Sequence, residues 1–220
     1  MSAYGTIKAP QGSTGPLPVL SYNLPNDLVL TTHPVQGADA PAELIDFLFA
    51  TFNKEIEDGK TYPQEDQMTR DQFVAYFFSS TTIVAIVSPA SVDVASLKTL
   101  EDARAGRPWE EVVGGVYYIK PNYPGRSSHN CNAGFIVPPS QRGRKVGYGL
   151  AESFLVYAPK LGYKSSVFNL VYSNNVASLR LWDKLGFQRV GLIPKAGRLK
   201  TGPNGAEEYV DAVVVYKSFE

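Results

Sequence analysis

The second half of the sequence alternates two kinds of apolar run, and this alternation limits the fold more than any other feature. Residues 131–137, 165–172 and 188–193 are short and largely apolar, which is typical of strands. Residues 145–162 and 175–186 lie between them and repeat apolar positions at helical spacing. Strands that alternate with helices predict βαβ units, in which helices cover the faces of a sheet.

The first half adds helices and strands in a different order. Residues 41–59 place apolar side chains four apart and end at a glycine, so they predict a helix. Residues 69–78 predict another helix, because Thr69 and Gln72 have the spacing of a capping box. Strand-like runs cover residues 18–23, 27–32, 81–88, 112–120 and 209–216. We therefore expect an α/β fold with a mixed sheet covered by helices.

Charge and composition exclude several classes of protein. The chain has 220 residues, and 21 basic side chains balance 21 acidic ones, so no global charge would attract nucleic acid or an anionic membrane. Cys131 is the single cysteine, which excludes a disulfide scaffold and favours a reducing compartment. Residues 1–20 lack the apolar core of a signal peptide. We expect a flexible lead over residues 1–20, a single domain over residues 21–220, and a soluble cytoplasmic protein.

A basic, glycine-rich turn joins the strand-like residues 131–137 to the helix-like residues 145–162. A helix start offers free N–H groups and the positive end of the helix dipole, so this turn can hold an anion such as a pyrophosphate. Glycines would let the ligand approach the backbone, and cations would supply charge; the alternative is a tight turn with solvated cations. The residues concerned are Arg142, Gly143, Arg144, Lys145, Gly147 and Gly149.

The turn fits one of three anion-binding patterns. It lacks the Gly-Lys-Ser or Gly-Lys-Thr ending of nucleoside-triphosphate loops and the Gly-x-Gly-x-x-Gly of dinucleotide sites. Residues 144–149 (RKVGYG) instead resemble the acyl-coenzyme A signature of the GCN5-related N-acetyltransferases (GNAT), an Arg or Gln followed by x-x-Gly-x-Gly or Ala. Residues 174–191 (NNVASLRLWDKLGFQRVG) resemble a later part of the same family, an Asn and a helix that closes in Lys-Leu-Gly-Phe. On these two motifs the chain is identified as a member of this family.

This resemblance implies a fold and a cosubstrate. The GNAT fold is a mixed, mostly antiparallel sheet of about seven strands flanked by helices, and the fourth and fifth strands splay apart to admit the pantetheine arm. The cosubstrate is then acetyl-coenzyme A, and no metal takes part. By resemblance, the coenzyme contacts Ile136, Val137, Arg142, Gly143, Arg144, Lys145, Val146, Gly147, Tyr148, Gly149 and Asn175.

A closer resemblance narrows the reaction. The stretches YIKPNY, SHNCNAGF, LGYK, FNLV, WDKL and GKTYPQ are similar to those of fungal acetyltransferases that detoxify the proline analogue L-azetidine-2-carboxylate. This implies acetylation of the ring nitrogen of a small cyclic secondary amino acid, such as azetidine-2-carboxylate or cis-4-hydroxyproline, with roles in detoxification and oxidative-stress tolerance. It also implies a homodimer.

The same resemblance assigns roles at the acceptor site. Asn132 and Asn169 would hold the carboxylate and ring nitrogen of the acceptor, and Phe135 would pack against its ring. Asn175 would bind the coenzyme near its thioester and polarise it, so Asn169 and Asn175 are the expected catalytic residues. For each Asn, the alternative is a residue that satisfies backbone groups at a turn or strand edge.

The expected chemistry lacks its usual acid and base. The acceptor amine must lose a proton, because an alkylammonium with a pKa of ~10.4 is almost entirely charged at pH 7. The predicted strands 131–137 and 165–172 carry amides but no carboxylate, and Trp182 stands where the family has the tyrosine that reprotonates the leaving thiolate. Amides orient an acceptor but cannot take its proton, so the acid and the base stay unassigned.

Other residues and functions stay open. Tyr62 and Pro63 either cap the acceptor pocket or form a turn, and Lys120 and Arg126 are either solvated or placed to meet an anion. The charged segment 93–111 resembles an inserted surface connection. The alternatives for the whole chain are an acetyltransferase for a polyamine or a protein amino terminus, and a sensor that binds acyl-coenzyme A without catalysis.

Overall fold

The fold is described by a computed structural model that covers residues 9–10, 12, 15–36 and 39–220. Most of the predicted flexible lead lies outside these residues, so that prediction and the single domain over residues 21–220 stay predictions. In the part of the chain that the structure covers, eight strands form one sheet. They are β1 (Leu20–Leu24), β2 (Leu28–Val35), β3 (Thr81–Pro89), β4 (Val113–Pro121), β5 (Asn130–Ile136), β6 (Ser165–Tyr172), β7 (Gln188–Leu199) and β8 (Glu208–Ser218).

Six α-helices form in the described residues: α1 (Ala42–Asp58), α2 (Arg70–Phe77), α3 (Leu100–Arg104), α4 (Trp109–Val112), α5 (Val146–Lys160) and α6 (Val176–Lys184). The four longer ones begin and end close to the predicted limits, whereas the two short ones, α3 and α4, were not predicted. Helix α1 ends at Gly59, which adopts the left-handed conformation with a φ of 61°. The capping box that precedes α2 is present, because the Thr69 side chain accepts from the Gln72 N–H while the Gln72 side chain accepts from the Thr69 N–H. These sequence predictions are confirmed.

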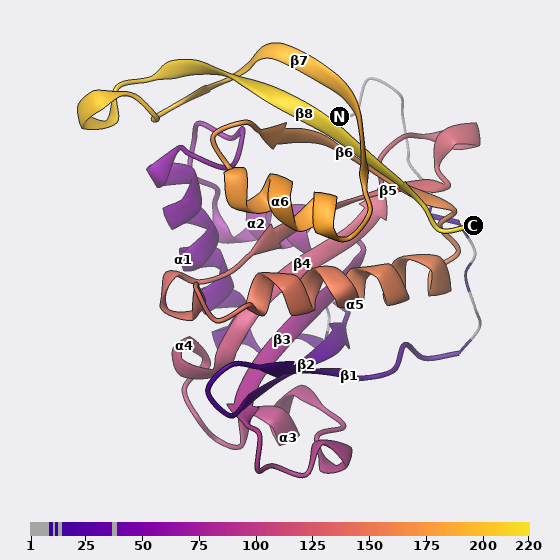
Figure 1. Ribbon diagram of the computed structural model, residues 1–220. Helices are drawn as coiled ribbons and strands as arrows, with labels where there is room; N and C mark the ends of the chain where they lie inside the picture. The colour runs from indigo at the N-terminus through magenta and orange to yellow at the C-terminus, as the bar shows by residue number, and fades with distance from the viewer. Residues whose placement is uncertain (1–8, 11, 13–14, 37–38) are drawn as a thin grey trace.

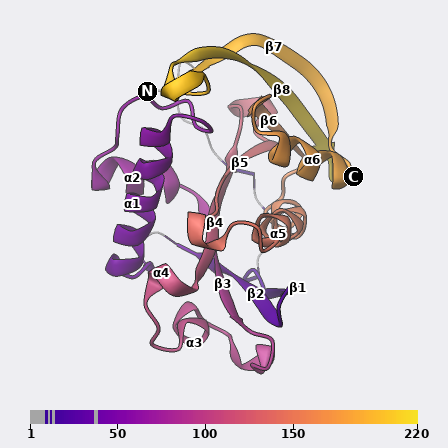
Figure 2. The ribbon, with the colours of Figure 1, turned by 60° about the vertical axis from the view of Figure 1, so that its left-hand side comes forward.

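Helices cover both faces of the sheet. Helices α1, α2 and α4 lie on one face, and α5 and α6 lie on the other (Figures 1 and 2). Because side chains alternate along a strand, β4 serves both cores: Tyr117 and Ile119 pack toward α5, whereas Val116 and Tyr118 pack toward α1 and α2. We call these the α5 face and the α1 face. The predicted mixed, mostly antiparallel sheet flanked by helices is confirmed.

The sheet splits between β5 and β6. These two strands run parallel and pair only at Asn130 with Ser165 and at Cys131 with Ser166, whereas every other neighbouring pair is antiparallel. Beyond Cys131 and Ser166 the two strands diverge. The sheet therefore splays between its fifth and sixth strands, not its fourth and fifth, because an N-terminal hairpin of β1 and β2 adds a strand to the expected seven.

Segment 93–111 is more than a surface connection. Leu97, Ala103 and Trp109 are buried in the core of the α1 face, and the guanidinium of Arg104 lies 4.4 Å from the centre of the Trp109 ring. This burial differs from the expected surface connection, because three apolar residues of the segment pack into the core. Its contacts fix the end of the α1 face away from the splay.

Candidate active site

The gap between β5 and β6 exposes backbone groups of β5. A Cβ added at Gly115 of β4 would lie 2.7 Å from the carbonyl oxygen of Ile136, so that oxygen faces β4. Backbone groups of successive strand residues point to opposite sides, so those of Phe135 and Val137 face the gap. Their oxygens are indeed bound there: the Phe135 oxygen accepts from the Tyr62 hydroxyl at 3.0 Å and the Val137 oxygen from Arg142 Nε at 3.1 Å. The N–H groups of Phe135 and Val137 are thus the ones turned toward a ligand.

The predicted anion-binding turn lies where β5 leads into α5. Lys145, with a left-handed φ of 61°, precedes the helix, and no side chain caps the helix start. Among the described residues, we find no hydrogen-bond partner for the backbone N–H groups of residues 143–147. Arg144 and Lys145 are exposed beside these free donors. An anion at this point would meet N–H groups, cations and the positive end of the α5 dipole together.

The three glycines of the turn do different work. A Cβ added at Gly147 would meet only Val137, at 3.9 Å, so this position keeps space open in front of the first turn of α5. Gly143 has a φ of 77°, which favours glycine in the turn itself. At Gly149 an added Cβ would lie 2.8 Å from the buried Leu30 side chain, so this glycine lets α5 pack on β2. Of the three, Gly147 has the surroundings expected of a ligand-facing glycine.

Arg142 is held by the protein itself. In addition to its bond to Val137, its guanidinium pairs with Glu55 of α1, and Glu55 also accepts from the Thr61 hydroxyl at 3.2 Å. The Glu55 side chain is only 11% exposed. Arg142 therefore ties the predicted anion-binding turn to α1, and it brings the carboxylate of Glu55 next to this turn.

A hollow of about 340 Å³ lies beside the first turn of α5. Lys145, Tyr148 and Lys184 line it together with residues of β1. Lys184 Nζ lies 4.5 Å from the centre of the Tyr148 ring, which keeps this ammonium at the hollow.

The acceptor residues predicted on β5 lie on opposite faces. Asn132 is paired across the sheet with Lys120, whose Nζ lies over the Tyr118 ring, so Asn132 is on the α1 face. Phe135, three residues later, packs on the α5 face against Tyr117 at 4.7 Å between ring centres. The two side chains therefore lie on opposite faces of the sheet and do not line the same side of an acceptor pocket.

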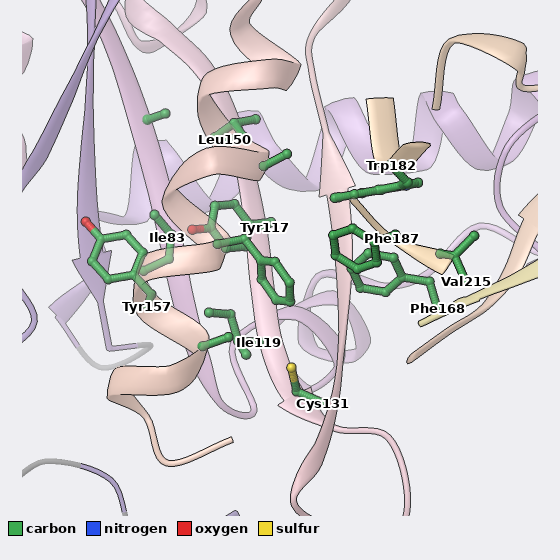
Figure 3. Packing of buried hydrophobic residues seen from close by; sticks show 14 of the residues in the cluster. Ile83, Tyr117, Ile119, Cys131, Leu150, Tyr157, Phe168, Trp182, Phe187 and Val215 are labelled. Carbon is green, nitrogen blue, oxygen red and sulfur yellow. The ribbon is translucent and has the colours of Figure 1, made fainter. Parts of the chain in front are cut away.

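Phe135 belongs to an aromatic cluster beneath the splay. Its ring lies 5.3 Å from Trp182, and Trp182 lies 4.6 Å from Phe168 and 4.9 Å from Phe187. Figure 3 shows Trp182, Phe168 and Phe187 gathered beside one another. Trp182 is 4% exposed, and its indole N–H donates to the Ser178 hydroxyl at 3.0 Å, so this residue is structural in the described fold.

Asn169 lies on the opposite side of the gap from Asn132 and is firmly held. Its side chain exchanges two hydrogen bonds with the Asn122 amide, at 2.7 and 3.1 Å, and accepts a third from the Tyr123 hydroxyl at 3.0 Å. For the Asn132 side chain we find no hydrogen bond to any residue in the described ranges. Asn132 therefore keeps its full donor and acceptor capacity for a ligand.

Asn175 is the N-cap of α6. Its side-chain oxygen accepts from the Ser178 N–H at 3.1 Å, which fixes the amide and leaves its NH₂ group as the free end. Asn174 instead donates to the Lys60 carbonyl at 2.9 Å. Of these neighbouring residues, Asn175 is the one for whose NH₂ group we find no partner in the described part of the chain.

Comparison with known proteins gives the family. The profile described as "Acetyltransferase (GNAT) family" matches residues 91–187. N-acetyltransferase aca1 of Schizosaccharomyces pombe is 45% identical over 177 residues, which cover 80% of this chain and 81% of aca1. The chain belongs to the GNAT acetyltransferase family. The acetyltransferase is also 27% identical to protein SPT10 of Saccharomyces cerevisiae over 88% of its own length but only 34% of the SPT10 chain.

Solved structures share the fold of the acetyltransferase. A GCN5-related N-acetyltransferase from Kribbella flavida superposes with a TM-score of 0.65 at 24% identity, covering 85% of this chain and 97% of that one. The acetyltransferase YncA from Salmonella typhimurium, determined with its cofactor acetyl-CoA, superposes with a TM-score of 0.63 at 16% identity, covering 87% and 94%. The prediction of an acetyl-coenzyme A-dependent N-acetyltransferase is confirmed at the level of the family.

The residues of the acetyltransferase fit this cosubstrate. The uncapped start of α5 and the open space at Gly147 suit a pyrophosphate, and the gap with its free N–H groups suits an amide-containing arm. We find no cluster of three or more metal-ligating side chains within the described ranges. Nor does any helix of those ranges have the length and apolarity to cross a bilayer.

Sequence reasoning missed one residue of the site, Glu55, and the backbone contact of another, Tyr62. Glu55 and Tyr62 reach the turn and β5 from positions 87 and 73 residues away from their partners, Arg142 and Phe135. Tyr62 was considered as a cap for the acceptor pocket, but nothing in the sequence indicated its contact with the β5 backbone. Glu55 has one local signal, a glutamate on the apolar stripe of α1, which is uncommon without a buried partner.

Proposed function

We propose that the acetyltransferase moves acetyl from acetyl-coenzyme A to the ring nitrogen of a small cyclic secondary amino acid such as L-azetidine-2-carboxylate or cis-4-hydroxyproline. One observation carries the acceptor class: Asn132 and Asn169 lie beyond the last paired residues of β5 and β6, one and three residues on, and neither strand bears a carboxylate. Amides can both donate to a carboxylate and accept from an amine, so they suit an amino acid better than a cation. The resemblance to fungal azetidine-2-carboxylate acetyltransferases supports the same class and a role in detoxification and oxidative-stress tolerance.

Each residue then has a task. The coenzyme supplies the acetyl group as a thioester, which the amine attacks directly. The free N–H groups of Phe135 and Val137 and the NH₂ group of Asn175 lie where they would hold the coenzyme arm and polarise the thioester carbonyl. Asn132 and Asn169 would orient the acceptor from the two walls of the gap. Phe135 packs on the α5 face, opposite to the α1 face on which Asn132 lies. We therefore give it a supporting role, in which it packs beneath the β5 backbone.

The polyamine alternative fits the site less well. A polyamine carries several ammonium groups and needs anions around it, but Glu55, the carboxylate that reaches the turn from α1, is already paired with Arg142. A protein amino terminus would need an open groove past the α1 face, where Tyr62 and Asn174 instead tie the loop after α1 to β5 and to the start of α6. We therefore favour the small acceptor.

We also propose a homodimer in the cytoplasm. Strand β7 is an edge of the sheet, and it exposes Val190, Leu192 and Ile193, each at least 39% accessible, while Tyr209 of β8 is 67% accessible. An exposed apolar edge strand favours pairing with another copy. The lone, buried Cys131 supports a reducing compartment. Light scattering on a size-exclusion column tests the dimer, and Leu192→Lys should yield monomer.

The first experiment measures release of coenzyme A from acetyl-coenzyme A with a thiol reagent, with azetidine-2-carboxylate, cis-4-hydroxyproline, proline and spermidine in parallel. Burial raises the pKa of the Cys131 thiol to about 12, so the protein itself adds no background. Turnover confined to the small ring acids supports the proposal. Turnover with spermidine alone overturns the acceptor, and coenzyme binding without any turnover would favour the sensor.

A further inference from the structure

Lys120 occupies an unusual position at the splay. It lies near the end of β4 on the α1 face, and its Nζ is 4.2 Å from the centre of the Tyr76 ring and 4.1 Å from that of Tyr118. The two tyrosines are themselves linked by a hydrogen bond of 3.0 Å between their hydroxyl groups. The faces of two fixed rings thus hold the ammonium in place.

Among the residues that the structure describes, this ammonium has no anionic partner. Within the described ranges we find no carboxylate oxygen within 4.0 Å of Lys120 Nζ and no hydrogen bond from it. The side chain is partly buried, and burial lowers the pKa of Lys120 to about 8. At neutral pH it is therefore still mainly charged, yet it has lost hydration that no ion pair replaces. An anionic ligand would compensate this loss.

Lys120 also stands beside the proposed acceptor site. It is the cross-strand neighbour of Asn132 on the same face. The next pair on this face of the sheet is Tyr118 with Gly134, where a Cβ added to the glycine would come within 2.7 Å of the Tyr118 ring. The sheet surface at this point is therefore flat and aromatic, with the ammonium and a free amide at its rim. A small ring acid could lie on it with its carboxylate toward the two polar groups.

We propose that Lys120 is a specificity-determining residue that binds the carboxylate of the acceptor and excludes polycations. This inference rests on the proposed function and adds the group that distinguishes an amino acid from a plain amine. The aromatic faces stabilise the charged form of the lysine, which suits an anion-binding group better than a proton acceptor. The groups that face it from α2 and β4, Tyr76 and Tyr118, do not supply a competing negative charge.

The test uses three ligands that differ in which of three groups they carry: the four-membered ring, the ring nitrogen and the carboxylate. Azetidine-2-carboxylate has all three, azetidine lacks the carboxylate, and cyclobutanecarboxylate lacks the nitrogen and serves as an inhibitor. In Lys120→Met we expect kcat/KM for azetidine-2-carboxylate to fall about tenfold or more and the inhibition constant of cyclobutanecarboxylate to rise similarly. Activity on azetidine and the affinity for acetyl-coenzyme A should stay within about twofold. Lys120→Arg should retain part of the carboxylate effect, and Lys98→Met, at an exposed lysine, is the matched control.

The results separate the two proposals. If the wild-type enzyme acetylates azetidine-2-carboxylate and Lys120→Met acts on it equally well, only the role of Lys120 is overturned. Equal losses on azetidine and azetidine-2-carboxylate, with a changed pH profile, would identify Lys120 as a proton acceptor and also overturn this role. If the wild-type enzyme acetylates only amines without a carboxylate, or neither ligand, both proposals fail.

Discussion

Glu55, in the last turn of α1, and Arg142, in the turn that precedes α5, form an ion pair between residues 87 positions apart in the sequence. The carboxylate is 11% exposed and the guanidinium 51% exposed, so the pair stands at the boundary between core and solvent. Because Arg142 also donates to Val137, the pair connects α1, the end of β5 and the coenzyme turn. Its loss should therefore affect both stability and coenzyme binding.

Glu55→Gln tests this connection. Removing one partner leaves a guanidinium with less compensation, but Arg142 is half exposed, so we expect a loss of about 1–2 kcal/mol in unfolding free energy. The KM for acetyl-coenzyme A should rise several-fold as the turn loosens, with less change in the acceptor KM. Urea unfolding and steady-state kinetics measure the two effects. Glu57→Gln, on the same helix in an exposed pair with Lys54, is the control; equal behaviour of the two variants would contradict the connection.

Substitution of Gly147 should weaken coenzyme binding, whereas substitution of Gly149 should lower the stability of the fold. Gly147→Glu has room at its Cβ, so the protein should fold with near wild-type stability while the affinity for acetyl-coenzyme A falls at least about tenfold. Gly149→Ala would press on Leu30 in the core and should cost about 1–3 kcal/mol with little direct effect on coenzyme affinity. Calorimetric binding and thermal unfolding separate the two. Undiminished coenzyme binding by Gly147→Glu would remove this glycine from the site.

Local patterns predicted the elements of this fold well. Helical spacing located α1, α5 and α6, and the Thr69–Gln72 capping box located α2. Each of these signals involves residues that are close together in the sequence, so it can be recognised without knowledge of the tertiary structure. The packing of Trp109 was missed, because the few apolar residues of this charged segment do not repeat at a regular helical or strand spacing.

The site was predictable in part. The turn that starts α5 is one local motif, whereas the contacts of Glu55 and Tyr62 depend on how α1 is placed against β5, which no spacing encodes. The opposite faces of Asn132 and Phe135 follow from strand alternation, since three residues separate them; grouping both as acceptor contacts gave too little weight to that rule.

Asn132 and Asn169 should differ in what their loss does to the protein. Asn132→Ala breaks no hydrogen bond that we find among the described residues, so we expect an increased acceptor KM or a reduced kcat with unchanged stability. Asn169→Ala leaves the Asn122 amide and the Tyr123 hydroxyl without their partner, so a loss of about 1 kcal/mol in stability should accompany the loss of activity.

Asn122→Ala is the control for the amide pair. It removes two of the three hydrogen bonds of Asn169 and keeps the bond from the Tyr123 hydroxyl, so its loss of stability should be no larger than that of Asn169→Ala while its activity stays higher. Coenzyme affinity, measured by calorimetry, should be unchanged in all three variants. Full activity of both Asn132→Ala and Asn169→Ala at low acceptor concentration would move the acceptor site elsewhere.

His33 should make the fold sensitive to mild acid. It lies on β2, 2% exposed, with Nε2 2.9 Å from the Thr31 hydroxyl, and burial lowers the pKa of His33 to about 4 despite the opposing charge of Asp102. An unfolded histidine titrates near ~6.5, so between these values the unfolded state binds more protons than the folded state. The contribution of His33 to the free energy of unfolding is therefore fully present above about pH 6.5, and it is lost as the pH falls toward 4.

The expected size of this effect at pH 5 is about 2 kcal/mol, from about 1.4 kcal/mol for each pH unit below ~6.5. Urea unfolding of wild type and His33→Leu at pH 7.5 and pH 5 measures it, since titrating carboxylates contribute to both proteins and cancel in the difference. His129→Asn, at the exposed second histidine, is the matched control. A pH dependence in His33→Leu as steep as that of wild type would mean that the buried imidazole does not govern the acid sensitivity.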